Sequence, residues 1–134
     1  MEISTSMVRS LMRSGNLAAE HNFHPEAIDI FNGVCAARPN SEIPLLGLAM
    51  VLMNTGKADE AIEVLQNKAL KISPDNQICK TFLGIAMNLK GQKQESDVLF
   101  DEVIEQNSDP HAVKLATATK EQGDVRRSPE EANA

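Results

Sequence analysis

Two histidines are the residues of this chain best spaced to ligate a metal. His21 and His24 lie three positions apart around a predicted turn. A zinc site needs further ligands, and no nearby cysteine or acidic cluster supplies them. We therefore interpret the pair as part of a polar turn, and His111 beside Pro110 as a residue at the start of a helix. No metal or cofactor is expected.

The two cysteines, Cys35 and Cys79, lie far apart in sequence and form no CxxC motif. We expect both to be reduced, at least half-buried thiols that act as small hydrophobic side chains. A disulfide or a redox role is the alternative.

Nothing in the sequence matches a catalytic motif. It contains no G-x-S-x-G, no P-loop and no G-x-G-x-x-G. The acidic residues are expected on solvent-facing sides of helices, where they form a solvated face and not a catalytic pair. Examples on the second helices of the hairpins are Asp59, Glu60, Glu63, Asp101, Glu102 and Glu105. The expected function is therefore not enzymatic.

Composition limits the fold and the partners. A chain of 134 residues fits one domain, and with 42% hydrophobic residues but no Trp or Tyr its core must be mainly aliphatic. The net charge of −6 argues against nucleic acid or an anionic membrane as partner, because both attract basic surfaces. There is no apolar run long enough to span a bilayer and no signal-peptide pattern, so a cytoplasmic location is expected.

Residues 41–76 show how the chain is organised. Apolar residues recur at helical spacing on both sides of a turn at Gly56, and Pro74 ends the second helix. Such a short helical hairpin cannot bury both faces alone, so it needs similar neighbours.

Those neighbours are visible as a repeat. Ala27-x-x-x-Phe31, Ala61-x-x-x-Leu65 and Ser96-x-x-x-Phe100 start 34 and then 35 residues apart. A helix-ending proline follows each one, and Gly56, Gly91 and Asn22 stand at equivalent turns. Leu83-Gly84 and its variant Leu48-Ala49 complete the match, so the chain resembles the tetratricopeptide repeat. Pro39, Pro74 and Pro110 are the three prolines.

The resemblance implies an all-α fold of three tandem tetratricopeptide helical hairpins plus a C-terminal capping helix. This is a short right-handed solenoid with a concave groove. The expected repeats are 3–39, 41–75 and 77–109, with the capping helix at 110–122, all in one domain of residues 1–123. Residues 124–134 are polar and without period, so we expect a disordered tail. One extra residue near Asn67 should make Ala69, in place of Lys68, the packing residue, through a bulge or a longer helix.

The first helices of the hairpins should line the concave wall, and their predicted groove-facing stripe is apolar. Either these residues only pack the hairpins together, or they bind a partner such as an amphipathic helix. We favour the partner. The groove lacks the Lys, Asn and Arg set with which co-chaperone repeats hold a terminal carboxylate. The predicted groove residues are Met12, Ala19, Ile43, Leu46, Met50, Met53, Ile78, Phe82, Ile85 and Leu89.

Size, acidity, three repeats and an apolar groove together resemble the chaperones of bacterial type III secretion, most of all those that keep the needle subunit monomeric. This likeness implies that the groove binds an amphipathic helix of a secreted needle-type protein and prevents its premature polymerisation. It also implies a small helical co-chaperone, which would cover the first hairpin. The alternatives are a chaperone of translocator proteins, or a non-catalytic repeat scaffold or structural component of the apparatus.

Overall fold

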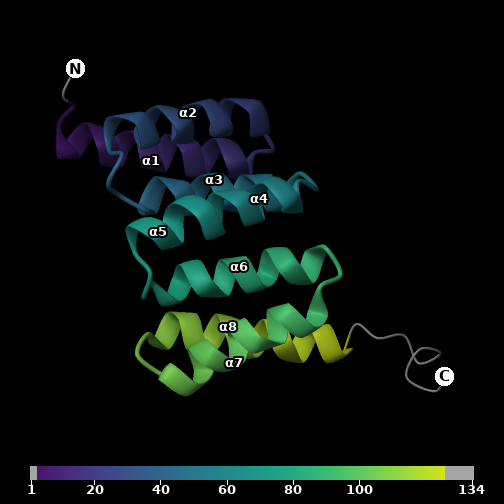
Figure 1. Ribbon diagram of the computed structural model, residues 1–134. Coiled ribbons are helices and arrows are strands. Elements are labelled where there is room, and N and C mark those ends of the chain that lie inside the picture. The colour runs from purple at the N-terminus through teal and green to yellow at the C-terminus, as the bar shows by residue number, and fades with distance from the viewer. Residues whose placement is uncertain (1–2, 126–134) are drawn as a thin grey trace.

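The computed structural model describes residues 3–125, and their side chains as far as Gln122. Every regular element in this part of the chain is a helix, and successive helices pair as hairpins that stack from the N-terminus to the C-terminus (Figure 1). This is the predicted all-α repeat architecture. The helices are α1 (Thr5–Glu20), α2 (His24–Ala37), α3 (Ile43–Asn54), α4 (Ala58–Val64), α5 (Leu70–Ile72), α6 (Gln77–Leu89), α7 (Lys93–Gln106) and α8 (Pro110–Val125), with the π-helical segment Leu65–Ala69 joining α4 to α5.

The three hairpin turns have the same geometry. Asn22, Gly56 and Gly91 adopt positive φ values of 64°, 77° and 88°, as predicted from the repeat. In each turn the next backbone N–H reaches back to a carbonyl in the last turn of the first helix. The donor–acceptor distances are 2.8 Å for Lys57 to Leu52 and 2.9 Å for Gln92 to Met87. The first helix therefore ends at the same point of every unit.

Phenylalanine rings fill the space between helices. Phe31 on α2 is fully buried and lies against Gly15 on α1 and Gly47 on α3. Phe100 on α7 lies in the same way against Gly84 on α6. The missing side chains of the glycines let the helices approach the rings, which is the packing that the repeat pattern predicts.

The buried residues form two clusters. The larger runs from Ala27 through α3 and α4 to Ala86 on α6. The smaller consists of Phe100 and Val103 on α7 with Ala112 and Ala116 on α8. The last helix therefore closes the end of the hydrophobic core.

The π-helical segment accommodates the extra residue of the second unit. After the central aromatic or leucine, the next buried residue follows three positions later in units one and three, at Val34 and Val103. In unit two it follows Leu65 four positions later, at Ala69, while Lys68 is exposed. The prediction that Ala69 packs inward through a bulge is confirmed.

The C-terminal helix differs from its prediction at one end. Its start is as expected, because Oδ1 of Asp109 accepts hydrogen bonds from the N–H groups of His111 and Ala112 at 3.0 and 3.2 Å. The prediction that the helix ends at Gly123 is wrong, since the helix continues to Val125. Most of the predicted disordered tail, residues 126–134, lies outside the described residues. Within residues 3–125, no helix is long and apolar enough to cross a membrane.

Candidate functional site: the concave face

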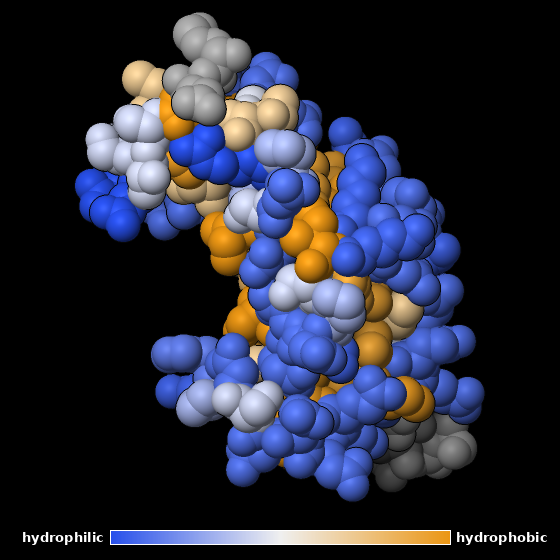
Figure 2. Space-filling model, turned by 60° about the vertical axis from the view of Figure 1, so that its left-hand side comes forward, coloured by the Kyte–Doolittle hydropathy of each residue, from blue (hydrophilic) through white to orange (hydrophobic). Residues whose placement is uncertain are grey.

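The first helix of each unit contacts the first helix of the next. The order of contacts is α1 with α3, α3 with α6, and α6 with α8. Figure 2 shows the molecule curved around a hollow, with hydrophobic side chains at its base, mainly hydrophilic ones on the lower arm and a mixture of both on the upper arm. The concave wall therefore has four helices, because α8 continues the row of the three predicted ones.

A first hollow, which we call the C-terminal hollow, opens between α3, α6 and α8 and has a volume of about 370 Å³. It brings together five of the ten predicted groove residues, namely Met50, Met53, Phe82, Ile85 and Leu89. Met50 and Leu89 are 45% and 53% exposed, so the described part of the chain leaves them uncovered. The remaining lining residues carry no charge: Asn54, Asn88, Leu115, Thr119 and Gln122.

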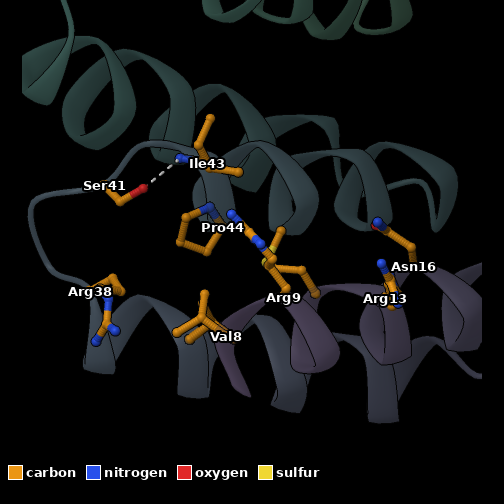
Figure 3. Close-up of a pocket in the computed structure, with 10 residues that line it drawn as sticks. Val8, Arg9, Arg13, Asn16, Arg38, Ser41, Ile43 and Pro44 are labelled. Atoms are coloured by element: carbon orange, nitrogen blue, oxygen red, sulfur yellow. Dashed lines mark hydrogen bonds between the residues drawn. The ribbon is translucent and has the colours of Figure 1, made fainter. Parts of the chain in front are cut away.

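A second hollow, which we call the N-terminal hollow, opens between α1 and α3 near the end of α2 and has a volume of about 530 Å³ (Figure 3). It contains two more predicted groove residues, Met12 and Ile43. Its polar lining is basic, since three arginines face it and no acidic residue of the described part of the chain does. The other lining residues are Val8, Arg9, Arg13, Asn16, Val34, Arg38, Ser41 and Pro44.

The remaining three predicted groove residues line neither hollow. Ala19 and Leu46 are half-buried against the larger cluster. Ile78 packs against the smaller cluster around Phe100, and Ile85 does so while also lining the C-terminal hollow. For these positions the alternative interpretation, packing between hairpins, describes the contacts in the structure.

Sequence reasoning missed two groups of lining residues. Leu115, Thr119 and Gln122 on α8 were not considered, because that helix was assigned only a capping role. Arg9 and Arg13 were missed although the signal was present: they lie one turn apart on α1, on either side of Met12.

The candidate ligand residues remain dispersed. In the part of the chain that the structure describes, no three His, Cys, Asp or Glu side chains come close enough to hold a metal ion. Cys35 and Cys79 are both free thiols, the first half-buried and the second buried. Burial raises the pKa of Cys79 to about 12, with a smaller contribution from Glu42, and it also raises the pKa of Cys35 against the opposing effect of Lys68. Neither thiol has the lowered pKa of a reactive cysteine.

The fold and the site together define a helical-repeat solenoid with a mostly apolar concave face. No protein-family model and no curated protein matches the chain. Several solved structures have the same fold, at low sequence identity to this chain.

Two similar structures are of the type III secretion translocator chaperone SycD from Yersinia enterocolitica. One has a TM-score of 0.79 at 17% identity and covers 92% of each chain. The other, in complex with a peptide of the translocator YopD, has a TM-score of 0.76 at 16% identity and covers 96% of this chain and 100% of SycD.

A third similar structure is the first tetratricopeptide domain of Spaghetti (RPAP3) bound to the HSP90 peptide SRMEEVD. It has a TM-score of 0.74 at 17% identity and covers 93% of this chain and 96% of that one. At these identities the comparisons establish the tetratricopeptide fold over almost the whole chain. None of the three structures is described as a needle-subunit chaperone.

Proposed function

We propose that the protein is a non-catalytic chaperone of a type III secretion system that binds a segment of a secreted client on its concave face. The observation that carries the proposal is the C-terminal hollow, where Met50 and Leu89 are about half exposed in an uncharged lining. Exposed apolar side chains gathered in one concavity are typical of an interaction site. The flexible side chains of Met50 and Met53 suit a surface that adapts to its ligand.

The client class that we propose first is a translocator protein. Its support is the similarity over nearly full length to SycD, which has been solved with a translocator peptide. The needle-type client expected from the sequence is the second candidate, and the apolar lining that five predicted residues share in the C-terminal hollow also suits an amphipathic helix. The small helical co-chaperone belongs to this second candidate only.

Burial of apolar surface is sufficient to drive such binding. A segment that places several apolar side chains in the concave face would bury several hundred Å², at about 25 cal/mol/Å². After the cost of ordering the segment, a dissociation constant in roughly the nanomolar to micromolar range is expected.

The proposal is tested with Met50→Glu, which places a charge in the C-terminal hollow. A matched control is Val98→Glu on α7, because Val98 is also exposed (56%) but does not line either hollow. Co-expression with the products of neighbouring genes should yield a complex with the wild type and with Val98→Glu, but not with Met50→Glu. Circular dichroism checks that all three proteins are equally helical. Retention of the client by Met50→Glu would overturn the proposed site.

The identity of the co-purified client separates the candidates. A large membrane-active protein supports the translocator class, and a small needle-like protein supports the second candidate. Binding as an extended strand or as a helix can be followed by the circular dichroism of a client peptide. Size-exclusion chromatography of the protein alone tests the remaining alternative, a structural component that associates with itself.

A further inference from the structure

The N-terminal hollow has a charge opposite to that of the whole protein. The chain carries a net charge of −6, yet Arg9, Arg13 and Arg38 face this hollow, and among the described residues no acidic side chain lines it. The C-terminal hollow on the same concave face has no charged lining residue within the part of the chain that the structure describes. The concave face is therefore asymmetric, with a basic end at α1 and a neutral end at α8.

Two of the three arginines are available to a ligand. Arg38 donates hydrogen bonds to the carbonyl oxygens of Ala37 and Ile3, and so holds the start of the described chain. Arg9 and Arg13 are exposed, and among the described residues neither takes part in a hydrogen bond or ion pair. Figure 3 shows both on α1, at the side of the hollow that faces α3.

The spacing of the available groups suits carboxylates in a row. Arg9 and Arg13 are one helical turn apart, about 6 Å along α1, and Asn16 follows on the same face. A guanidinium binds a carboxylate through two parallel N–H donors, a geometry that lysine lacks. The same hollow has apolar lining residues, Met12 on α1 and Ile43 and Pro44 on the facing helix α3. This combination fits an apolar side chain flanked by acidic ones.

From this charge complementarity we propose that the concave face selects a client segment with acidic side chains at one end, and that this end lies at α1 with its carboxylates on Arg9 and Arg13. The inference rests on the proposed function and deepens it, because it specifies the chemistry and the direction of the bound segment. The ligand groups are Asp or Glu side chains within the segment. A free C-terminal carboxylate is a single group and would not occupy a row of two arginines.

The experiment uses three fluorescent peptides that share one apolar stripe. The first has two glutamates one helical turn apart near one end, and the second has glutamines there. Both are amidated at the C-terminus. The third is the glutamine peptide with a free C-terminal carboxylate. Dissociation constants are measured by fluorescence anisotropy at low and high salt, with the wild type, with Arg9→Gln/Arg13→Gln, and with Lys57→Gln/Lys71→Gln. The lysine variant removes the same charge from exposed positions that line neither hollow.

We expect the wild type and the lysine variant to bind the acidic peptide roughly tenfold more tightly than the glutamine peptide at low salt, and less selectively at high salt. The arginine variant should bind all three peptides about equally. A spin label at the acidic end should broaden the amide signals of α1 and not those of α8.

The inference is overturned if the arginine variant keeps the preference, if the lysine variant loses it equally, or if the free carboxylate alone produces it. Broadening at α8 would overturn the direction. Equal binding of all peptides by the wild type removes the inference and leaves the proposed function intact, whereas failure of every peptide to bind removes both.

Discussion

A methyl group on Gly47 would lie 2.7 Å from Cε1 of Phe31, closer than such atoms approach in real proteins. Gly15 on α1 is equally close to the ring, since a methyl group there would lie 2.8 Å from the same atom. Phe31 is thus held between the backbones of α1 and α3, and it connects the first unit to the second.

Adding a side chain at this contact should destabilise the protein. We expect Gly47→Ala to lower the free energy of unfolding by about 1–3 kcal/mol through overpacking against Phe31. The control is Gly33→Ala on α2, where a Cβ would meet no atom within 4 Å. That change should stabilise the helix by about 0.5–1 kcal/mol. Urea unfolding followed by circular dichroism measures both, and equal effects at the two sites would contradict the close contact.

The π-helical segment predicts which of two adjacent residues tolerates a charge. Ala69→Glu should lower the free energy of unfolding by about 3 kcal/mol or more, because it places an unpaired carboxylate in the core. Lys68→Glu should change it by less than about 1 kcal/mol, since Lys68 is exposed. Thermal unfolding of both variants is the test. The reverse order would mean that the helix keeps ordinary α-helical register past Leu65.

Asn76 joins two units at the start of α6. Its Oδ1 accepts from the N–H of Cys79 at 2.9 Å as an N-cap, and its amide donates to Oε1 of Glu42 at 3.1 Å. We expect Asn76→Ala to reduce the free energy of unfolding by about 1–2 kcal/mol. The side chain of Ser4, the exposed N-cap of α1, makes only the bond to Met7 among the described residues, so Ser4→Ala should cost less. Chemical denaturation decides, and an equal loss at the two caps would show that the contact with Glu42 contributes nothing.

The raised pKa of Cys79 predicts a loss of stability at alkaline pH. In the unfolded chain a cysteine ionises near about 8.5, while in the folded protein burial holds the pKa of Cys79 at about 12. Between these values the folded state binds the proton more tightly. The contribution of Cys79 to the free energy of unfolding is fully present below its pKa in the unfolded chain. It is lost as pH rises toward its pKa in the folded protein, with a slope of up to about 1.4 kcal/mol per pH unit.

The measurement is the urea unfolding free energy of the wild type and of Cys79→Ala between pH 8 and roughly pH 10.5. The wild type should lose stability faster than the variant across this range. Cys35→Ala serves as the control, because Cys35 is only half-buried and Lys68 opposes the rise of its pKa. Parallel curves for the wild type and Cys79→Ala would contradict the burial of this thiol.

The sequence was sufficient for features that each repeat determines locally. The turns at Asn22, Gly56 and Gly91 follow from backbone conformation within one hairpin. The inward position of Ala69 follows from counting residues against the other units. These predictions depend on neighbours only a few positions or one hairpin away, where periodicity carries the information.

Features that depend on how units meet were not predictable in the same way. Ile78 belongs to an apolar stripe of α6, but in the structure it packs against the cluster that α7 and α8 form, and it lines neither hollow. Arg9 and Arg13 on α1 become part of a hollow only because α3, with Ile43, lies opposite them. A glycine often ends a helix, because it readily adopts positive φ. The helix α8 nevertheless continues through Gly123, so the presence of a glycine alone predicted the wrong end.

The helix α8 contributes both to the hydrophobic core and to the C-terminal hollow, and this has a thermodynamic consequence. Ala112 and Ala116 close the cluster at Phe100, whereas Leu115 and Thr119 on the same helix border the C-terminal hollow. A guest that rests on Leu115 binds only while this helix is docked, so occupancy and helix docking are linked. Slower amide hydrogen exchange along α8 should then report a bound client segment in the hollow, even where the segment itself gives no detectable signal.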